Sequence, residues 1–414
     1  MELYYSFSVL IVLASFFAYL NIRYLKLPST IGVMLIAMAV SVMLVITGNI
    51  FPKTLGHLSG LLNDVDFTEV LMGAMLNFLL FAGAIHIHLA DLREQRLPVV
   101  VFSTVSVVIS TLAVGAIFYR VFPVLGLQVP FIYCLLFGAL ISPTDPIAVL
   151  GILKQAKVPK ALETKVAGES LFNDGVAVVV FAVILQLAQG SEIELSVANV
   201  SWLLVKEALG GFLLGSLLGI GASNAMRKID DYKVSVLITL SVVMGGYLIA
   251  QAIHISGPLT MVAAGLVIGN YGKNTAMSEV TKDYLNKFWE LIDEILNAIL
   301  FLFIGFELLI IPNIWSYWLV GLAGIAVVLF SRFLSIWIPA KLVPFKSKFD
   351  SGTIKILVWG GLRGGVSIAL ALSMDEGPYK GLLISITYFV VVFSIVVQGL
   401  TIGRLASRVL PKAD

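Results

Sequence analysis

The residues best placed to do chemistry lie together in one apolar stretch, which contains Glu169, Ser170, Asn173 and Asp174. Residues four apart share a helix face, so Glu169 is expected beside Asn173 and Ser170 beside Asp174, with the two pairs about 100° apart around the helix. A carboxylate and a hydroxyl on one face offer the oxygen ligands that hard cations prefer. This face therefore predicts a cation site in which Asp174 is the main ligand.

The composition places these residues inside a membrane. Of the 414 residues, 59% are hydrophobic and 13% are charged, whereas soluble proteins carry roughly 25% charged residues. The mean hydropathy is +1.00. A soluble enzyme, a secreted scaffold and a nucleic-acid binder are excluded, and the net charge of +2 attracts no nucleic acid. The N-terminal apolar stretch lacks a basic region before it and is interpreted as a retained helix rather than a signal peptide. We therefore expect an all-α polytopic membrane protein.

Thirteen apolar runs are long enough to cross about 30 Å of hydrocarbon. They are 4–22, 29–47, 68–88, 98–119, 128–152, 166–189, 199–225, 234–253, 256–270, 286–310, 314–340, 353–373 and 379–403. The polar gaps between them are too short for a soluble domain. Any ligand site is therefore expected among the helices.

The basic residues predict how these spans are oriented. Of the 27 Lys and Arg residues, 21 fall on one side of the predicted membrane, four fall on the other, and Arg332 and Arg363 lie within spans. Cytoplasmic loops carry the excess of Lys and Arg. We therefore expect the protein to lie in a cell (inner) membrane, with its N-terminus outside and its C-terminus in the cytoplasm.

Helix-breaking residues interrupt two spans. The fifth contains Pro143 and Pro146, each of which removes a backbone donor and crowds the preceding turn. The twelfth contains four glycines around Leu362 and Arg363, and glycine weakens a helix. These breaks lie seven spans apart, as expected if spans 1 to 6 and 8 to 13 are inverted repeats joined by span 7. Paired interruptions of this kind mark the binding site of secondary transporters.

The break in the fifth span can bring further oxygen ligands to Asp174. Non-helical backbone is tolerated at membrane depth where it lines a wet cavity, so the carbonyl of Thr144 and the carboxylate of Asp145 can reach a cation there. Together with Ser170, these residues complete the predicted cation site.

Two buried arginines need partners, because a charge near the bilayer centre costs at least about 2.5–3.5 kcal/mol. Arg332 lies too deep to reach water and is the expected partner of the face that carries Glu169. Arg363 is interpreted as a fixed charge beside the second break, next to Gly364. Three more acidic residues have two explanations: they lie at a solvated end of a helix, or they form a funnel that attracts cations. They are Glu290, Asp293 and Glu294.

Three motifs resemble the monovalent cation:proton antiporters of the NhaP/NHE type. They are Ser142-Pro143-Thr144-Asp145-Pro146, then Gly168-Glu169-Ser170 followed by Asn173-Asp174, and finally Leu362-Arg363-Gly364-Gly365. The resemblance covers essentially the whole chain. It implies a homodimer with a mobile core: spans 1 to 3 (1–95) and 7 to 10 (191–312, with the linker) form the dimerisation side, and spans 4 to 6 (96–190) and 11 to 13 (313–414) form the core.

The resemblance also assigns roles to residues. It implies that Asp174 carries either Na⁺ or a proton, assisted by Asp145, Ser170 and the carbonyl of Thr144, and that Glu169 pairs with Arg332. Asn173, in place of a second aspartate, is similar to the electroneutral one-for-one exchangers. One departure is Leu80-Phe81-Ala82, because members of this group often have an acidic residue where Ala82 stands.

The expected activity is secondary antiport of Na⁺ or Li⁺ against H⁺, which would serve pH homeostasis. Burial favours a protonated Asp174 and a bound cation favours the ionised form, so the two occupants exclude each other. No cofactor or enzymatic reaction is expected. A K⁺/H⁺ antiporter is the nearest alternative, followed by a cation channel and then by an intramembrane protease, which lacks an evident nucleophile with a histidine base.

Overall fold

Helices are the only regular elements in the part of the chain that the computed structural model describes, which comprises residues 2–48, 70–145, 149–151, 153, 158–189, 197–309, 314–346 and 349–409. The helices of the first half are α1 (Glu2–Leu20), α2 (Ser29–Gly48), α5 (Leu76–Ile85), α6 (Leu89–Glu94), α7 (Arg96–Val124), α8 (Phe131–Leu140) and α10 (Lys160–Ala188). Those of the second half are α11 (Val197–Met226), α12 (Tyr232–Ala252), α13 (Gly257–Val267), α14 (Lys273–Ala276), α15 (Glu279–Phe306), α16 (Trp318–Leu342), α17 (Ser351–Trp359), α18 (Gly365–Leu372), α19 (Lys380–Phe393) and α20 (Gly399–Val409).

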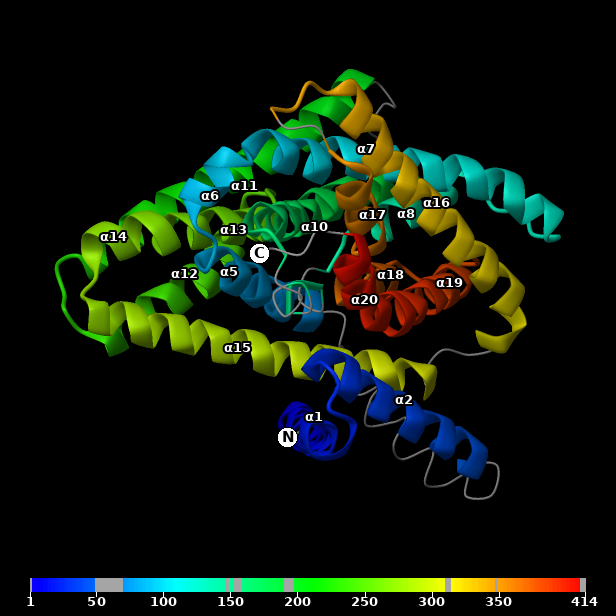
Figure 1. Cartoon of the computed structure of the whole chain (residues 1–414), viewed down its shortest axis with the longest axis horizontal. Helices are drawn as coiled ribbons and strands as arrows, with labels where there is room; N and C mark the ends of the chain where they lie inside the picture. Colours follow the sequence, from blue (N-terminus) through cyan, green and yellow to red (C-terminus); the bar gives the residue numbers. More distant parts are fainter. Residues whose placement is uncertain are drawn as a thin grey trace.

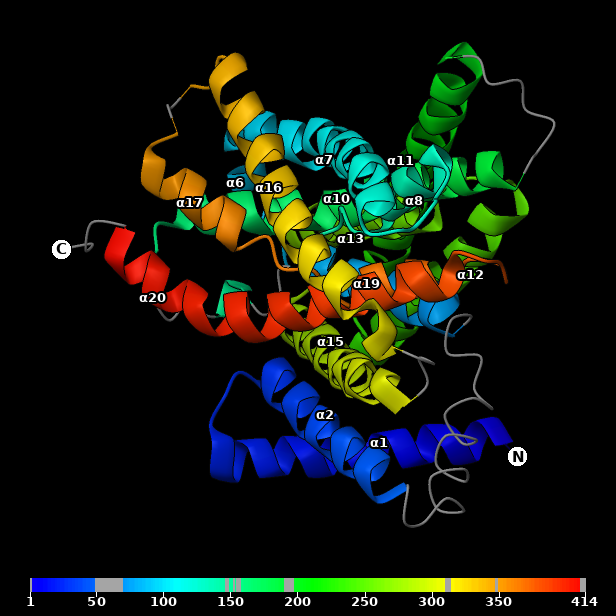
Figure 2. The same ribbon diagram turned by 90° about the vertical axis from the view of Figure 1, so that its right-hand side faces the viewer.

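Eight helical segments among these residues are long and apolar enough to cross a membrane. One of them runs through α19, a π-helical turn and α20 without interruption (Figure 2). The segments Gly73–Ile85 and Phe131–Leu140 are shorter apolar helices. The expectation of an all-α membrane protein is confirmed, whereas the thirteen crossings and the inverted repeats stay predictions.

Helix α10, which contains the carboxylates singled out in the sequence, lies at the centre of the molecule (Figure 1). It packs against α7 and α8 on one side and against α11 and α13 on the other. Helices α1 and α2 pack beneath α15, away from α10 (Figure 2). The central position buries α10 on nearly all sides, which explains why its polar residues must find partners inside the protein.

Short polar side chains fix where several helices begin. Asp231 accepts hydrogen bonds from two backbone N–H groups at the start of α12, and Asp350 does the same for α17. Ser256 and Ser278 cap α13 and α15 in the same way. These caps satisfy N–H groups that a helix leaves unpaired at its first turn.

A stripe of glycines brings α11 directly against α13. A Cβ atom added at Gly211 would lie 2.6 Å from the carbonyl oxygen of Ser256, and one at Gly215 would collide with that of Thr260. Gly219 continues the stripe one turn further along. Small residues at this spacing let two membrane helices approach until their backbones touch.

The single cysteine of the chain, Cys134, is part of an apolar core on the other side of α10. It is fully buried in α8, beside Leu136 and Phe137 in the sequence. This core is built from α7, α8, α16, α18 and α19. It includes Leu140, at the end of α8 from which the first break extends.

The glycine stripe can be tested with two alanine substitutions in the same helix. Gly215→Ala should destabilise the protein by about 1–3 kcal/mol, because the new methyl group overlaps the backbone of α13. Gly221→Ala is the control: the space beside Gly221 is open, so alanine should be neutral or slightly stabilising as the better helix former. The thermal midpoints of the two purified variants in detergent provide the comparison, and equal midpoints would contradict close packing at Gly215.

Candidate ion-binding site

The predicted interruptions of two apolar spans are present in the structure. Helix α8 ends at Leu140, ahead of Pro143, and the described residues beyond the break, 149–151 and 153, are helical again. Pro146 lies outside the described residues. In the other span, residues 360–364 separate α17 from α18. Both breaks therefore leave backbone groups without the hydrogen bonds of a continuous helix.

The two breaks contact each other. The backbone N–H of Asp145 donates to the carbonyl oxygen of Leu362 at 2.8 Å. The backbone of Gly364 passes so close that an added Cβ atom would lie 2.5 Å from Oδ2 of Asp145. A residue with a side chain at position 364 would thus displace the Asp145 carboxylate, which gives the predicted role of Gly364 a steric reason.

Arg363 fills the gap left by the first break. Its Nη1 donates to the carbonyl oxygens of Ser142 and Pro143 at 2.5 and 3.0 Å. Its own backbone N–H donates to Oγ of Ser394 at 2.9 Å, and that hydroxyl donates to Oε1 of Gln398 at 2.7 Å. The guanidinium is 2% exposed. Arg363 is therefore a buried fixed charge that binds the broken end of α8, in line with its interpretation from the sequence.

Thr144, Ser170 and Asn173 form a hydrogen-bonded cluster between the first break and α10. The side-chain oxygen of Asn173 accepts from the backbone N–H of Thr144 at 3.3 Å, and its Nδ2 donates to Oγ1 of Thr144 at 2.6 Å. The hydroxyls of Thr144 and Ser170 lie 3.1 Å apart. Asn173 thus holds the break against α10. Among the described residues it forms no hydrogen bond with an arginine, although it shares a face with Glu169.

Asp174 lies one helical turn from Ser170 on α10, in the electrostatic field of Asp145 and Arg363. The residue is 7% exposed, and its Oδ1 has no hydrogen-bond partner among the described residues. The carboxylates of Asp174 and Asp145 lie close enough to repel each other, and Arg363 lies close enough to attract Asp174. Two carboxylates and two hydroxyls in this arrangement supply only oxygen ligands, which suits a small hard cation.

A cavity of about 600 Å³ leads to these carboxylates from the surface. Asp145, Asp174 and Gly364 line its inner end, and the exposed residues His88 and Lys160 line its opening. Its walls come from α5, α10, α15 and α18 and are largely apolar. Water and small ions can therefore reach Asp174 from this side.

Helix α15 adds an acidic wall to the cavity. Glu290 and Asp293 line it, together with Asn297, which donates to the carbonyl oxygen of Asp293 at 2.8 Å. Of the two sequence-based explanations for these acidic residues, the structure favours the funnel for Glu290 and Asp293. Ala82, where an acidic residue was expected from the resemblance, also lines the cavity and provides no ligand.

Glu169 and Arg332 form the buried contact expected from the sequence. Nη1 of Arg332 donates to Oε1 of Glu169 at 2.6 Å, and both side chains are at most 6% exposed. Nη2 of Arg332 donates to the carbonyl oxygen of Leu357 in α17 at 2.9 Å. Gly361 passes directly beside Nε of Arg332, where a Cβ atom would collide. Arg332 therefore connects α10 to α17 through two of its nitrogen atoms.

Sequence reasoning did not identify Ser394 and Gln398 as part of this region. They hold Arg363 and also reach α17, because Nε2 of Gln398 donates to the carbonyl oxygen of Trp359 at 2.9 Å. A signal for them exists: a serine and a glutamine four residues apart interrupt an otherwise apolar run and share a helix face.

Comparison with known proteins gives matches over the whole chain. The Na⁺/H⁺ antiporter NhaP of Pseudomonas aeruginosa is 49% identical over 408 residues, which cover 97% of this chain and 96% of that protein. The Na⁺/H⁺ antiporter NhaH of Halobacillus aidingensis is 36% identical over 351 residues, or 83% of each chain.

A solved structure shows the same fold. The sodium proton antiporter MjNhaP1 from Methanocaldococcus jannaschii at pH 8 matches with a TM-score of 0.78 over 100% of both chains, at 21% identity. The profile of the family described as sodium/hydrogen exchanger, transmembrane, matches residues 11–408. Taken with the two helix breaks that contact each other and the buried carboxylates, these matches show that the chain belongs to the sodium/hydrogen exchanger family and is a secondary transporter, not an enzyme.

Proposed function

We propose that this protein exchanges Na⁺ or Li⁺ for H⁺ at Asp174. The observation that carries the proposal is that Asp174 lines the inner end of an open cavity and that its buried Oδ1 has no hydrogen-bond partner among the described residues. The neighbouring Thr144, Ser170 and Asn173, in contrast, are hydrogen-bonded to one another. A cation there would be bound by Asp174, Asp145, Ser170 and Thr144. The relatives named as Na⁺/H⁺ antiporters support the choice of ions.

Competition for one carboxylate couples the two fluxes. A buried carboxylate without a cation is costly, so Asp174 either takes a proton or binds a cation. Each occupant neutralises it, and a neutral site can move through the bilayer at lower cost than an empty, charged one. Because Asn173 is uncharged and Glu169 is paired with Arg332, one cation exchanges for one proton and the cycle is electroneutral.

Alternating access would come from movement of the core against the dimerisation side. In this scheme the chain crosses the membrane thirteen times as two inverted repeats, 96–190 and 313–414 form the moving core of each subunit, and 1–95 and 191–312 form the homodimer contact. The cavity opens beside Lys160, on the side with the excess of basic residues. The positive-inside rule makes that side cytoplasmic. In this proposal the cavity therefore opens inward, in a cell-membrane exchanger that serves pH homeostasis.

Asp174→Asn should abolish cation-dependent proton movement in proteoliposomes, because asparagine neither binds a proton nor neutralises a cation. Fluorescent pH dyes with Na⁺, Li⁺ and K⁺ across a range of pH provide the measurement, and a response to K⁺ alone would identify a K⁺/H⁺ antiporter. Glu163→Gln is a matched control, since Glu163 lies on the same helix and lines the same cavity near its opening. It should retain most of the exchange, and full exchange by the Asp174 variant would refute the proposal.

Electroneutral exchange predicts that membrane potential leaves the rate unchanged. A cycle that moves one net charge gains or loses about 2.3 kcal/mol per 100 mV, enough to change its rate many-fold. The exchange rate should be measured in proteoliposomes whose potential is clamped with K⁺ and valinomycin. A steady dependence of the rate on voltage would show that the stoichiometry is not one to one.

Glu169 and Arg332 should behave as a pair that supports the fold. Glu169→Met or Arg332→Met alone leaves one charge buried without its partner and should cost about 3–5 kcal/mol, whereas the double variant should lose less than either single variant. Thermal unfolding in detergent measures these losses. The exposed pair Lys160–Asp91, with side chains 73% and 32% exposed, is the control, and Asp91→Asn should cost at most about 1 kcal/mol. Additive losses at Glu169 and Arg332 would mean that the two side chains act independently.

A further inference from the structure

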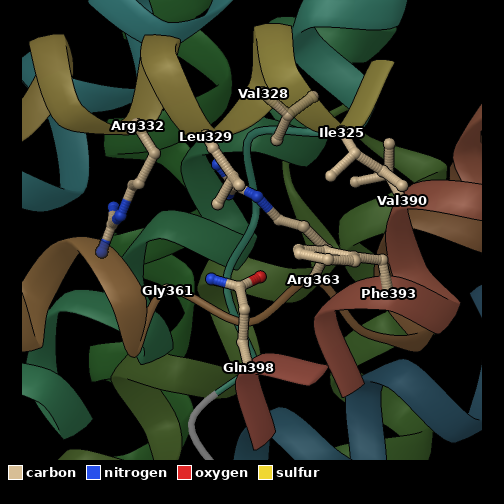
Figure 3. Close-up of a pocket in the computed structure, with 9 residues that line it drawn as sticks. All are labelled: Ile325, Val328, Leu329, Arg332, Gly361, Arg363, Val390, Phe393 and Gln398. Atoms are coloured by element: carbon tan, nitrogen blue, oxygen red, sulfur yellow. The ribbon is translucent and has the colours of Figure 1, made fainter. Parts of the chain in front are cut away.

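A small cavity is lined by the two buried arginines, apart from the large cavity that reaches Asp174 (Figure 3). In Figure 3, Arg332 enters from above on α16, Gln398 enters from below, and Arg363 reaches between them. The volume is about 10 Å³. The remaining lining is apolar apart from the backbone of Gly361: Ile325, Val328, Leu329, Val390 and Phe393.

Both arginines have an unused hydrogen-bond donor here. Nε of Arg332 and Nη2 of Arg363 are buried and have no partner among the described residues. The other nitrogen atoms of these side chains donate elsewhere: those of Arg332 bind Glu169 and the carbonyl group of Leu357, and Nη1 of Arg363 binds the broken end of α8. Buried donors on charged groups nearly always have a partner, because leaving one without a hydrogen bond costs about 1–3 kcal/mol or more.

The missing partner must accept hydrogen bonds and must be small. A cavity holds one water molecule when it offers roughly 10–15 Å³ and two to four polar groups. Arg332, Arg363 and Gln398 supply three polar side chains around a space of this size. A chloride ion also accepts hydrogen bonds but is larger than water, and the five apolar side chains leave it no further room.

We propose that this cavity binds one ordered water molecule, which accepts hydrogen bonds from Nε of Arg332 and Nη2 of Arg363 and donates to the amide oxygen of Gln398. The water connects two groups of contacts that are otherwise separate. Arg332 holds Glu169 on α10, and Arg363 holds the carbonyl groups of the first helix break. The water would join the Glu169–Arg332 ion pair and the two contacting helix breaks into one hydrogen-bonded unit. It would also reduce the repulsion between the two guanidinium groups.

Adding one methyl group to the cavity lining distinguishes a filled cavity from an empty one. Val328→Ile adds one carbon atom to a side chain that lines the cavity. We expect it to evict the water and to leave two charged donors unpaired. Its thermal midpoint in detergent should fall by about 2 °C or more relative to Val327→Ile. Val327 is the matched control, because it is the neighbouring buried valine of α16 and does not line the cavity.

If the cavity were empty, Val328→Ile would raise the thermal midpoint instead of lowering it, because filling a void with apolar atoms is stabilising. A midpoint for Val328→Ile equal to or above that of Val327→Ile would therefore overturn the proposal.

A second measurement does not depend on how well isoleucine packs. An experimental map of the unsubstituted protein, at a resolution that shows other buried waters, should contain density within hydrogen-bond distance of Nε of Arg332 and Nη2 of Arg363. Empty density there would overturn the proposal. The midpoint of the unsubstituted protein should also be equal in sodium chloride, bromide and gluconate at one ionic strength. A halide-specific rise that Val328→Ile removes would show an anion in place of water.

Discussion

Unwound backbone inside a membrane must find its hydrogen-bond partners within the protein, and Arg363 meets this requirement at the break after α8. Its guanidinium supplies donors to two carbonyl groups that a continuous helix would have paired, while Leu362 in the opposite break accepts from Asp145. Each break thus supplies hydrogen-bond partners for backbone groups of the other. The contact between the breaks is favourable because the Arg363 guanidinium lies at the carbonyl end of α8, where the helix dipole also favours positive charge.

This arrangement determines which side-chain groups remain available to bind an ion. Arg332 neutralises Glu169, Asn173 is occupied by Thr144, and Arg363 is held by carbonyl groups without an ion pair among the described residues. The free oxygen of Asp174 lies in the field of that unpaired positive charge and of Asp145. A cation at Asp174 would not require Arg332, Asn173 or Arg363 to move, because each of these side chains already has its own hydrogen-bond partners.

The sequence predicted an all-α membrane protein, both breaks and the contact between Glu169 and Arg332, because each depends on hydropathy, on helix-breaking residues or on the cost of a buried charge. It did not predict the partner of Asn173. The spacing of four residues places Asn173 on the same helix face as Glu169. It does not say that one turn of this face contacts Arg332 and the next turn contacts Thr144. The roles of Ser394 and Gln398 depend on contacts between distant segments, and the position of Asp293 on the cavity wall depends on how α15 is rotated. Both are set by tertiary packing, which a single sequence does not reveal.

The burial of Cys134 has a practical consequence. Since the chain has no other thiol and this one is enclosed by the core of α7, α8 and α16, a maleimide reagent applied to the folded protein would have no native target. Spin labels or fluorophores could then be attached at chosen surface positions without first replacing any residue. Distances between a label on α15 and one on α19 would report, in lipid, whether these two helices move relative to each other when Na⁺ or pH is changed.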